Sequence, residues 1–351
     1  MARVLQKKYG VRFASLIELK MKRIYVFLWV IAFAVSSAYA SHTHKRQTAQ
    51  FVDLSLANNP QPGDAVRPGA SGPAVLRAQI LLDRAAFSPG EIDAAYGANL
   101  RSAVRGFQAA HQLPAEDELG PETWARLNMD TAPVLIPYEI STEDVAGPFQ
   151  RVPADMMKKS KLKSLGYQSP LELLAEKFHV SPRVLTLLNE GKAFDRAGQQ
   201  ILVPNVRIPT EPAPKAASVL VRKNDMTVSA LDADGTVIAQ FPASVGSEHD
   251  PLPIGKWKIN GVSKNPPFHY NPNLFWDAEA KHSAATIAPG PNNPVGVVWI
   301  DLSKPHYGIH GTPEPSQVGH TQSHGCIRLT NWDAARLAGM VSPGMPAVLT
   351  E

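Results

Sequence analysis

Residues 307–329 read YGIHGTPEPSQVGHTQSHGCIRL. This stretch brings a histidine, His310, and a cysteine, Cys326, into one short region rich in glycine. Cys326 is the only cysteine among 351 residues, so it cannot form a disulfide within the chain. It is either an incidental buried residue or a reactive thiol, and its neighbours decide between these two interpretations.

His310 is the predicted base for a Cys326 nucleophile. An ordinary cysteine, with a pKa of about 8.5, is only about 3% ionised at pH 7, and the thiolate is the reactive form. A base that accepts the thiol proton removes this handicap, and a pKa lowered by about 2 units is equivalent to roughly 2.7 kcal/mol. No acidic residue lies beside His310 in the sequence. We therefore expect the backbone carbonyl of Gly311 to hold its tautomer.

Amide cleavage also needs donors for the negative charge that develops on the carbonyl oxygen. Gly325, with the backbone N–H groups of His324 and Cys326, is the predicted oxyanion site, because glycine leaves such donors unobstructed. The His324 side chain is expected to orient its loop rather than to act as a second base. Arg328 is a candidate for binding a substrate carboxylate, although an ordinary surface ion pair fits the sequence equally well.

Several phrases in this region resemble the L,D-transpeptidase catalytic-domain family, whose signature is a His followed by Ser/Thr-His-Gly-Cys. Leu252 departs from the family pattern, because Thr is usual at that position. The resemblance covers about residues 217–350 and implies a mostly β catalytic domain. The phrases that carry it are Gly246-Ser247, Pro253-Ile254-Gly255-Lys256-Trp257, Ile309-His310-Gly311-Thr312, Ser323-His324-Gly325-Cys326-Ile327-Arg328-Leu329 and Asn331-Trp332-Asp333.

The resemblance implies an acyl-enzyme on Cys326. The thiol would attack the bond between a diamino acid and terminal D-Ala in a peptidoglycan tetrapeptide stem, and D-Ala would leave. An amine on a neighbouring stem or on a wall-anchored protein would then resolve the thioester, with His310 as general base. Resolution by water would make the same site an L,D-carboxypeptidase. No cofactor is implied, and carbapenems are the expected acylating inhibitors.

Two further interpretations stay open. His310, His320, His324 and Cys326 are all possible zinc ligands, but their spacing matches no closed zinc motif, so we predict no metal. A degenerate catalytic domain could also serve as a non-catalytic scaffold that binds the wall. The intact His310 and Cys326 argue against degeneracy.

Strand patterns fill the predicted catalytic domain, residues 217–351. Short apolar runs cover 219–221, 226–231, 237–241, 257–259 and 295–300, and Asp234-Gly235 marks a hairpin turn. One helix is expected over 332–340, after the capping candidates Thr330 and Asn331. The aromatic segment 268–276 reads either as a lid or substrate wall, which makes Tyr270 a substrate-binding candidate, or as a packed loop.

A small all-α bundle is predicted over residues 71–130. Helical spacing begins at Pro73, at Asn99 as a cap, and at Gly120-Pro121. The region 73–128 resembles the helical peptidoglycan-binding module of cell-wall enzymes, through Val75-Leu76-Arg77-Ala78-Gln79, Tyr96-Gly97, Ala103-Val104-Arg105-Gly106-Phe107-Gln108 and Leu119-Gly120-Pro121-Glu122-Thr123-Trp124.

Between the two modules, residues 138–206 suggest a strand, two helices and a closing strand at 201–204. This α/β order resembles a LysM fold, and residues 190–204 resemble its ending. A linker stiffened by prolines follows over 207–216. The chain is therefore predicted to be multidomain, with peptidoglycan glycan and stem peptides as its partners.

The N-terminus predicts export. Lys22 and Arg23 precede an apolar run and Ala38-Tyr39-Ala40, which reads as a signal peptide over 1–40 with a mature start near Ser41, whether translation begins at Met1 or Met21. A polar spacer follows over 41–70. Residues 1–40 hold seven of the 35 basic residues and one of the 31 acidic ones. The mature chain is therefore slightly acidic, which argues against a nucleic-acid partner and fits the periplasm or cell envelope.

Overall fold

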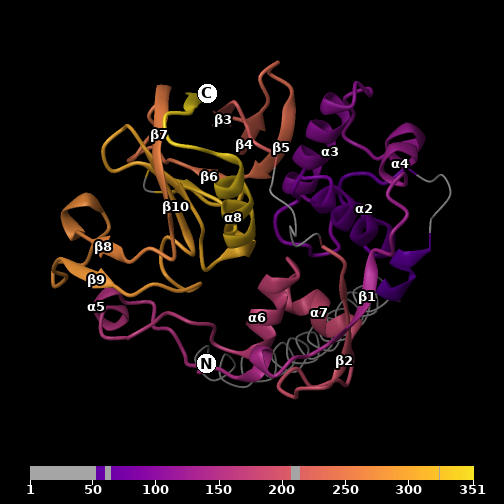
Figure 1. The fold of residues 1–351 in the computed structure, drawn as a ribbon, viewed down its shortest axis with the longest axis horizontal. Coiled ribbons are helices and arrows are strands. Elements are labelled where there is room, and N and C mark those ends of the chain that lie inside the picture. Colours follow the sequence, from indigo (N-terminus) through magenta and orange to yellow (C-terminus); the bar gives the residue numbers. More distant parts are fainter. Residues whose placement is uncertain (1–52, 60–64, 207–213, 324) are drawn as a thin grey trace, which may run out of the picture. The chain divides into compact units, whose positions relative to one another are not determined.

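A computed structural model describes residues 53–59, 65–206, 214–323 and 325–351 (Figure 1). The predicted signal peptide, much of the spacer, most of the 207–216 linker and His324 lie outside these described residues. Asp53–Glu351 form one compact unit. None of the described helices is both long enough and apolar enough to cross a membrane.

The helical module contains α2 (Pro73–Arg84), α3 (Ala98–Ala110) and α4 (Pro121–Leu127), preceded by the 3-10 helix η1 (Leu54–Asn58) (Figure 1). Helices α2 and α4 both begin with proline, whose missing N–H costs no hydrogen bond in a first turn. Their apolar faces form a buried interior that includes Leu76, Ile80, Val104, Phe107 and Trp124. The predicted helical character of this region is confirmed.

The prediction that Asn99 caps α3 is wrong. Gly97 holds the N-cap position in an extended conformation. Asn99 lies inside the first turn, and its side-chain amide donates to the carbonyl of Val318 at 2.8 Å. Because that partner is remote in the sequence, the local pattern could not reveal it.

The segment between the helical module and the catalytic domain, here called the middle segment (residues 135–206), has the predicted order of strand, two helices and strand. β1 (Leu135–Glu139) pairs antiparallel with β2 (Gln200–Pro204), and α6 (Pro170–Lys177) and α7 (Pro182–Leu188) lie between them in sequence. A serine hydroxyl caps each helix, Ser169 for α6 and Ser181 for α7. Between β1 and α6 the chain also contains η2 (Glu143–Val145) and α5 (Met156–Lys159). Assignment to the LysM fold stays a prediction.

The C-terminal domain is mostly β, as predicted. Its described residues form a nine-stranded sheet in the order β5-β4-β3-β13-β7-β10-β11-β12-β6. β3 pairs with β13, and β11 with β12, in parallel. The strands are β3 (Ser218–Arg222), β4 (Thr227–Leu231), β5 (Val237–Pro242), β6 (Ser244–Val245), β7 (Gly255–Lys264), β10 (Val298–Leu302), β11 (Gly308–His310), β12 (Ile327–Arg328) and β13 (Pro346–Thr350).

Helix α8 (Asn331–Met340) contacts β10 and β11, and Leu337 from this helix joins Ile300 and Ile309 in the buried core of the domain (Figure 1). Thr330 is the N-cap of α8, since its side chain accepts a hydrogen bond from the backbone N–H of Asp333. The predicted helix therefore starts as expected. The short strands β6, β11 and β12 escaped prediction, because two or three residues next to glycines carry no periodic pattern.

A smaller hairpin stands outside the large sheet. β8 (Phe268–Tyr270) pairs with β9 (Ala285–Ile287), and η3 (Pro272–Leu274) lies in the connection. Tyr270 and Ile287 are buried together with Leu165 from the middle segment. The hairpin therefore packs on a part of the chain that precedes the catalytic domain.

Four charged or titratable residues from three parts of the chain meet in what we call the buried junction: Asp83 of α2, His179 after α6, and Asp333 and Arg336 of α8. Nδ1 of His179 lies 2.9 Å from a carboxylate oxygen of Asp83, and the Arg336 guanidinium donates to the Asp83 carbonyl at 2.7 Å. Ser88 donates to the Asp333 carboxylate at 2.8 Å. Burial opposes ionisation of Asp83, but the charges of His179 and Arg336 outweigh it and lower its pKa.

Candidate active site

The β11–β12 pair brings His310 and Cys326 close together. In this parallel pair Ile309 is level with Ile327, and His310 with Arg328. Side chains alternate across a strand, so Arg328 points away from the face that carries Ile327. His310 shares a face with Arg328, with which it is level. Cys326 directly precedes β12, and the charge of Arg328 acts on both His310 and Cys326, so the three side chains are near one another. Fifteen residues lie between His310 and Cys326 in the sequence, and the pairing of β11 with β12 brings the two ends of this stretch back together.

His310 is buried and held on two sides. Only 5% of the residue is exposed. Its ring stacks on Trp299, with centroids 5.5 Å apart and planes 16° from parallel. Trp299 can lie there because Gly308 has no side chain: a Cβ at Gly308 would come within 2.5 Å of the indole. The apolar run 295–300 predicted this strand, but no sequence pattern indicated the role of its tryptophan.

The Nδ1 atom of His310 lies 2.6 Å from the carbonyl oxygen of Gly311. A carbonyl can only accept, so this bond requires the proton on Nδ1 and leaves Nε2 as the basic nitrogen. Gly311 is itself packed against Asn331, and a Cβ on Gly311 would overlap the Asn331 amide. The Gly311 carbonyl therefore has the geometry expected of a group that orients His310.

Cys326 is half-buried, and its thiol lies 3.6 Å from the carbonyl oxygen of His306. The Ser323 hydroxyl donates to the Cys326 carbonyl at 2.5 Å. Gly325 has φ of +91°, a conformation that side chains disfavour, and a Cβ there would lie 2.9 Å from the Tyr307 ring. Both its positive φ and its closeness to the Tyr307 ring therefore favour glycine at position 325. This fits the predicted role of Gly325 in an oxyanion site.

Burial keeps both reacting groups neutral at rest. It lowers the pKa of His310 to about 4, with a further contribution from the positive charge of Arg328. Burial also raises the pKa of the Cys326 thiol, against the opposing effects of the Gly308 backbone and Arg328. The expectation that His310 depresses the thiol pKa is not met in this state. A neutral imidazole can still accept the thiol proton while the sulfur attacks.

Arg328 is a half-buried cation beside the nucleophile. Burial lowers the pKa of its guanidinium, while the negative charge of Glu314 and of an ionised Cys326 raises it. Its Nε atom is buried and has no hydrogen-bond partner among the described residues. A carboxylate-binding role for Arg328 stays a prediction, and this buried Nε is the donor that would serve it.

The other predicted substrate contact, Tyr270, lies in the β8–β9 hairpin. It is 4% exposed, and its hydroxyl is 2.9 Å from Nδ1 of His282. These contacts describe a packed residue, so a substrate-binding role for Tyr270 stays a prediction. Trp276, from the same aromatic segment, is instead 63% exposed and lies over His249, with ring centroids 4.6 Å apart.

One group of potential metal ligands occurs among the described residues, and it lies outside the β11–β12 site. It consists of Asp155, Glu279 and His282, whose ligand atoms lie within 4.8 Å of one another. These side chains already have partners, since Glu279 pairs with Lys281 at 2.8 Å and His282 lies 3.3 Å from Asp155. Within the described residues, His310, His320 and Cys326 do not form such a group.

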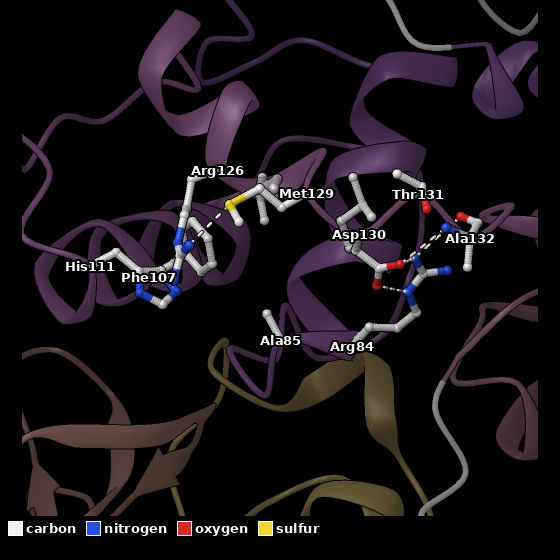
Figure 2. Close-up of a pocket in the computed structure, with 11 residues that line it drawn as sticks. Arg84, Ala85, Phe107, His111, Arg126, Met129, Asp130, Thr131 and Ala132 are labelled. Carbon is white, nitrogen blue, oxygen red and sulfur yellow. Dashed lines mark hydrogen bonds and ion pairs between the residues drawn. The ribbon is translucent and has the colours of Figure 1, made fainter.

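An open pocket of about 560 Å³ occurs in the helical module (Figure 2). Phe107 and His111 of the α3 region form one side, and Arg126 of α4 donates to the sulfur of Met129 at 3.0 Å. Arg84 at the other end is held by Asp130, whose carboxylate accepts from its Nε at 2.7 Å. The pocket thus combines apolar surface with an exposed guanidinium, that of Arg126.

Comparisons with known proteins match two parts of the chain to known families. Residues 216–349 match the L,D-transpeptidase catalytic domain (YkuD) family, and residues 71–127 match the family described as "Putative peptidoglycan binding domain". The "Putative L,D-transpeptidase YkuD" of Bacillus licheniformis is 32% identical over 183 residues, which are 51% of this chain and 93% of that protein.

The protein of the same name from Bacillus subtilis is 30% identical over 50% of this chain and 89% of its own length. The "Probable L,D-transpeptidase YbiS" of Escherichia coli is 24% identical, over 51% of this chain and 59% of its own length. The chain therefore belongs to the L,D-transpeptidase family. It is an enzyme of peptidoglycan that carries a peptidoglycan-binding module, and both modules associate it with the cell wall.

Proposed function

We propose that the protein transfers peptidoglycan stem peptides through a thioester on Cys326. The observation that supports this proposal is the parallel pairing of β11 with β12, which puts His310 level with Arg328, two residues after Cys326. A thiol, a neutral imidazole and a guanidinium are groups that suit acyl transfer from a charged peptide.

In the first half-reaction the Cys326 sulfur attacks the carbonyl carbon that joins the diamino acid to terminal D-Ala. Nε2 of His310 takes the thiol proton as the S–C bond forms. The same proton then goes to the nitrogen of D-Ala as the C–N bond breaks. Because Nδ1 is bonded to the Gly311 carbonyl, Nε2 is the nitrogen available for both transfers.

In the second half-reaction an acceptor amine attacks the thioester carbon. His310 removes a proton from that amine, the C–S bond breaks, and the thiolate regains the proton. The backbone N–H groups around Gly325 stabilise the negative oxygen in both tetrahedral intermediates. His324, which lies outside the described residues, contributes through its backbone N–H and by orienting the loop.

Arg328 binds a carboxylate of the stem peptide. A buried donor without a partner is costly, and a planar guanidinium can bond a carboxylate at two points. Trp276 and His249 form an exposed aromatic wall for the substrate. The pocket around Phe107, His111 and Arg126 binds peptidoglycan and keeps the enzyme at the wall.

The primary acceptor is an amine, either on a neighbouring stem or on a protein to be attached to the wall. Resolution by water, which would make the enzyme an L,D-carboxypeptidase, is the alternative that the same residues support.

We further propose that the N-terminal 40 residues direct export and that carbapenems acylate Cys326. The mature chain then consists of three modules joined by two linkers. The modules are 71–130, 138–206 and 217–351, and the linkers are 41–70 and 207–216.

Incubation of the protein with purified disaccharide-tetrapeptide, followed by mass spectrometry of products and intact protein, tests the proposal. Wild type should release D-Ala, form crosslinked dimer and carry an acyl adduct, whereas Cys326→Ala should do none of these. Tripeptide without dimer would favour the carboxypeptidase. D-Ala release by Cys326→Ala would refute the nucleophile, and an unreactive wild type that also resists carbapenem labelling would favour the scaffold.

A further inference from the structure

Glu176, which precedes the catalytic domain in the sequence, reaches into that domain through helix α6. Its two carboxylate oxygens lie 3.1 and 3.2 Å from the side-chain nitrogen of Asn331, at the start of α8. Tyr167, also outside the catalytic domain, donates its hydroxyl to one of these oxygens at 3.0 Å. The middle segment thus supplies a polar contact to a buried residue of the catalytic domain.

Asn331 is 2% exposed, and its amide is fully used. The nitrogen also donates to the carbonyl of Pro291 at 3.1 Å, and the oxygen accepts from the backbone N–H of Val297 at 3.2 Å. Because the nitrogen faces only acceptors and the oxygen faces a donor, the amide has one favourable orientation. Glu176 is the charged member of this set, and charge-assisted hydrogen bonds are the stronger kind.

The Asn331 amide packs directly on the group that orients His310. A Cβ added to Gly311 would overlap the Asn331 side-chain oxygen, and a Cβ on Gly296 would do the same. Gly311 in turn offers its carbonyl to Nδ1 of His310 at 2.6 Å. The contacts therefore run without a gap from Glu176 through Asn331 and Gly311 to His310.

The position of Glu176 is electrostatically unfavourable, which argues that it is not an incidental contact. Burial raises its pKa to about 7, although the hydrogen bonds from Asn331 and Tyr167 oppose this rise. A neutral side chain there would avoid the desolvation cost. Glu172, on the same helix, accepts a comparable hydrogen bond at 2.7 Å from Asn292, whereas the atoms nearest to a Cβ at Gly311 all belong to Asn331.

We propose that Glu176 is a positioning residue for catalysis: by fixing the Asn331 amide against Gly311, it holds His310 in the tautomer and orientation that Cys326 needs. The active site is then complete only when the middle segment is docked on the catalytic domain. This inference rests on the proposed function of His310 as the base for Cys326.

The test compares Glu176→Ala, Glu176→Gln and the matched control Glu172→Ala in the full chain. The readout is the second-order rate of Cys326 alkylation by iodoacetamide at pH 7.5, followed by intact-protein mass spectrometry. We expect Glu176→Ala to lower this rate about tenfold and Glu172→Ala to change it less than twofold. Glu176→Gln should stay within about threefold of wild type, because one amide oxygen can accept from both Tyr167 and Asn331.

Nitrogen NMR of the His310 ring, assigned with His310→Gln, supplies a second readout that needs no substrate. Wild type should show protonated Nδ1, and Glu176→Ala should show a mixture of tautomers. If Glu176→Ala does not fold, Glu176→Asp takes its place, since it keeps the charge but withdraws the carboxylate from Asn331.

An unchanged His310 tautomer in the Ala or Asp variant would overturn the proposal, as would equal losses of alkylation in Glu176→Ala and Glu172→Ala. Neither readout requires D-Ala release. A chain that positions His310 through Glu176 but does not process tetrapeptide would therefore contradict the proposed function alone.

Discussion

Two polar regions of the molecule, the β11–β12 site and the buried junction, are assembled in opposite ways. The β11–β12 site takes His310 and Cys326 from one stretch of 23 residues. The junction takes Asp83, His179 and Arg336 from three separate parts of the chain. In the first, the reacting pair His310 and Cys326 is neutral at rest, whereas the second pairs charges.

The pKa shifts express this difference. In the β11–β12 site burial is the largest cause, so it lowers the pKa of His310, together with the charge of Arg328, and raises that of Cys326. In the junction the opposite charges lower the pKa of Asp83 in spite of its burial. The neighbouring Asp333 is less favourably placed for ionisation, because burial and the charge of Asp83 raise its pKa to about 6. Groups that must exchange a proton are left unpaired, while groups that hold modules together are paired.

The largest effect is expected at the junction. Asp83→Ala leaves Arg336 and His179 facing a buried gap, and the loss of one partner from a buried ion pair costs roughly 3–5 kcal/mol. Chemical denaturation should show this loss of unfolding free energy. Lys223→Ala, which removes an exposed pair with Glu351, is the control and should change stability little. If the two variants lost equal unfolding free energy, the buried pair would stabilise the protein no more than the exposed pair does.

A smaller effect, on rate rather than stability, is expected from Gly325→Ala. The new methyl group meets the Tyr307 ring at 2.9 Å and disturbs the oxyanion donors, so acylation by a carbapenem should slow about 100-fold, equivalent to about 2.7 kcal/mol. Gly344→Ala is the matched control, since its φ of +85° is similar and nothing lies within 4 Å of the new atom. If Gly344→Ala slows acylation equally, backbone strain and not the site geometry is responsible.

The pH dependence of Cys326 alkylation tests whether the resting pair is neutral. Between pH 6 and 8 the rate should rise about tenfold per unit, since burial raises the thiol pKa and each unit of pH increases the thiolate fraction tenfold. His310, with a pKa of about 4, stays neutral throughout this range. A rate that is already level at pH 6 would instead mean that the thiol proton passes to His310 before or during attack, so that free thiolate carries none of the reaction.

The smallest effect is expected in the pocket of the helical module. Arg126→Ala removes its exposed guanidinium, and sacculus binding in a sedimentation assay should weaken about threefold, since an exposed ionic contact contributes less than about 1 kcal/mol. Arg101→Ala, at an exposed cation of the same module outside the pocket, is the control. Equal weakening by the two variants would mean that overall charge, and not this pocket, attracts the wall.

The sequence predicted most of what is local. Gly120 before α4, Pro121 as its first residue and the Thr330 cap of α8 marked helix starts, because capping depends on residues within one turn. The alternating runs of β3, β4 and β5 were also recognisable. Strands of two or three residues such as β12 were not, since they are defined by their partner strands and have no pattern of their own.

Within the site, residue types and spacing were enough to predict His310 and Cys326 as reacting groups, because a thiol nucleophile needs a base and glycines around it. Sequence alone also suggested the Gly311 carbonyl. Only the tertiary structure decided what surrounds them: Trp299 against the His310 ring, Asn331 beneath Gly311, and Glu176 on Asn331. Asn99 and Tyr270 likewise have partners, Val318 and His282, that no local pattern indicates. The physical reason is that chemistry and capping act over neighbouring residues, whereas burial and orientation arise where distant segments pack.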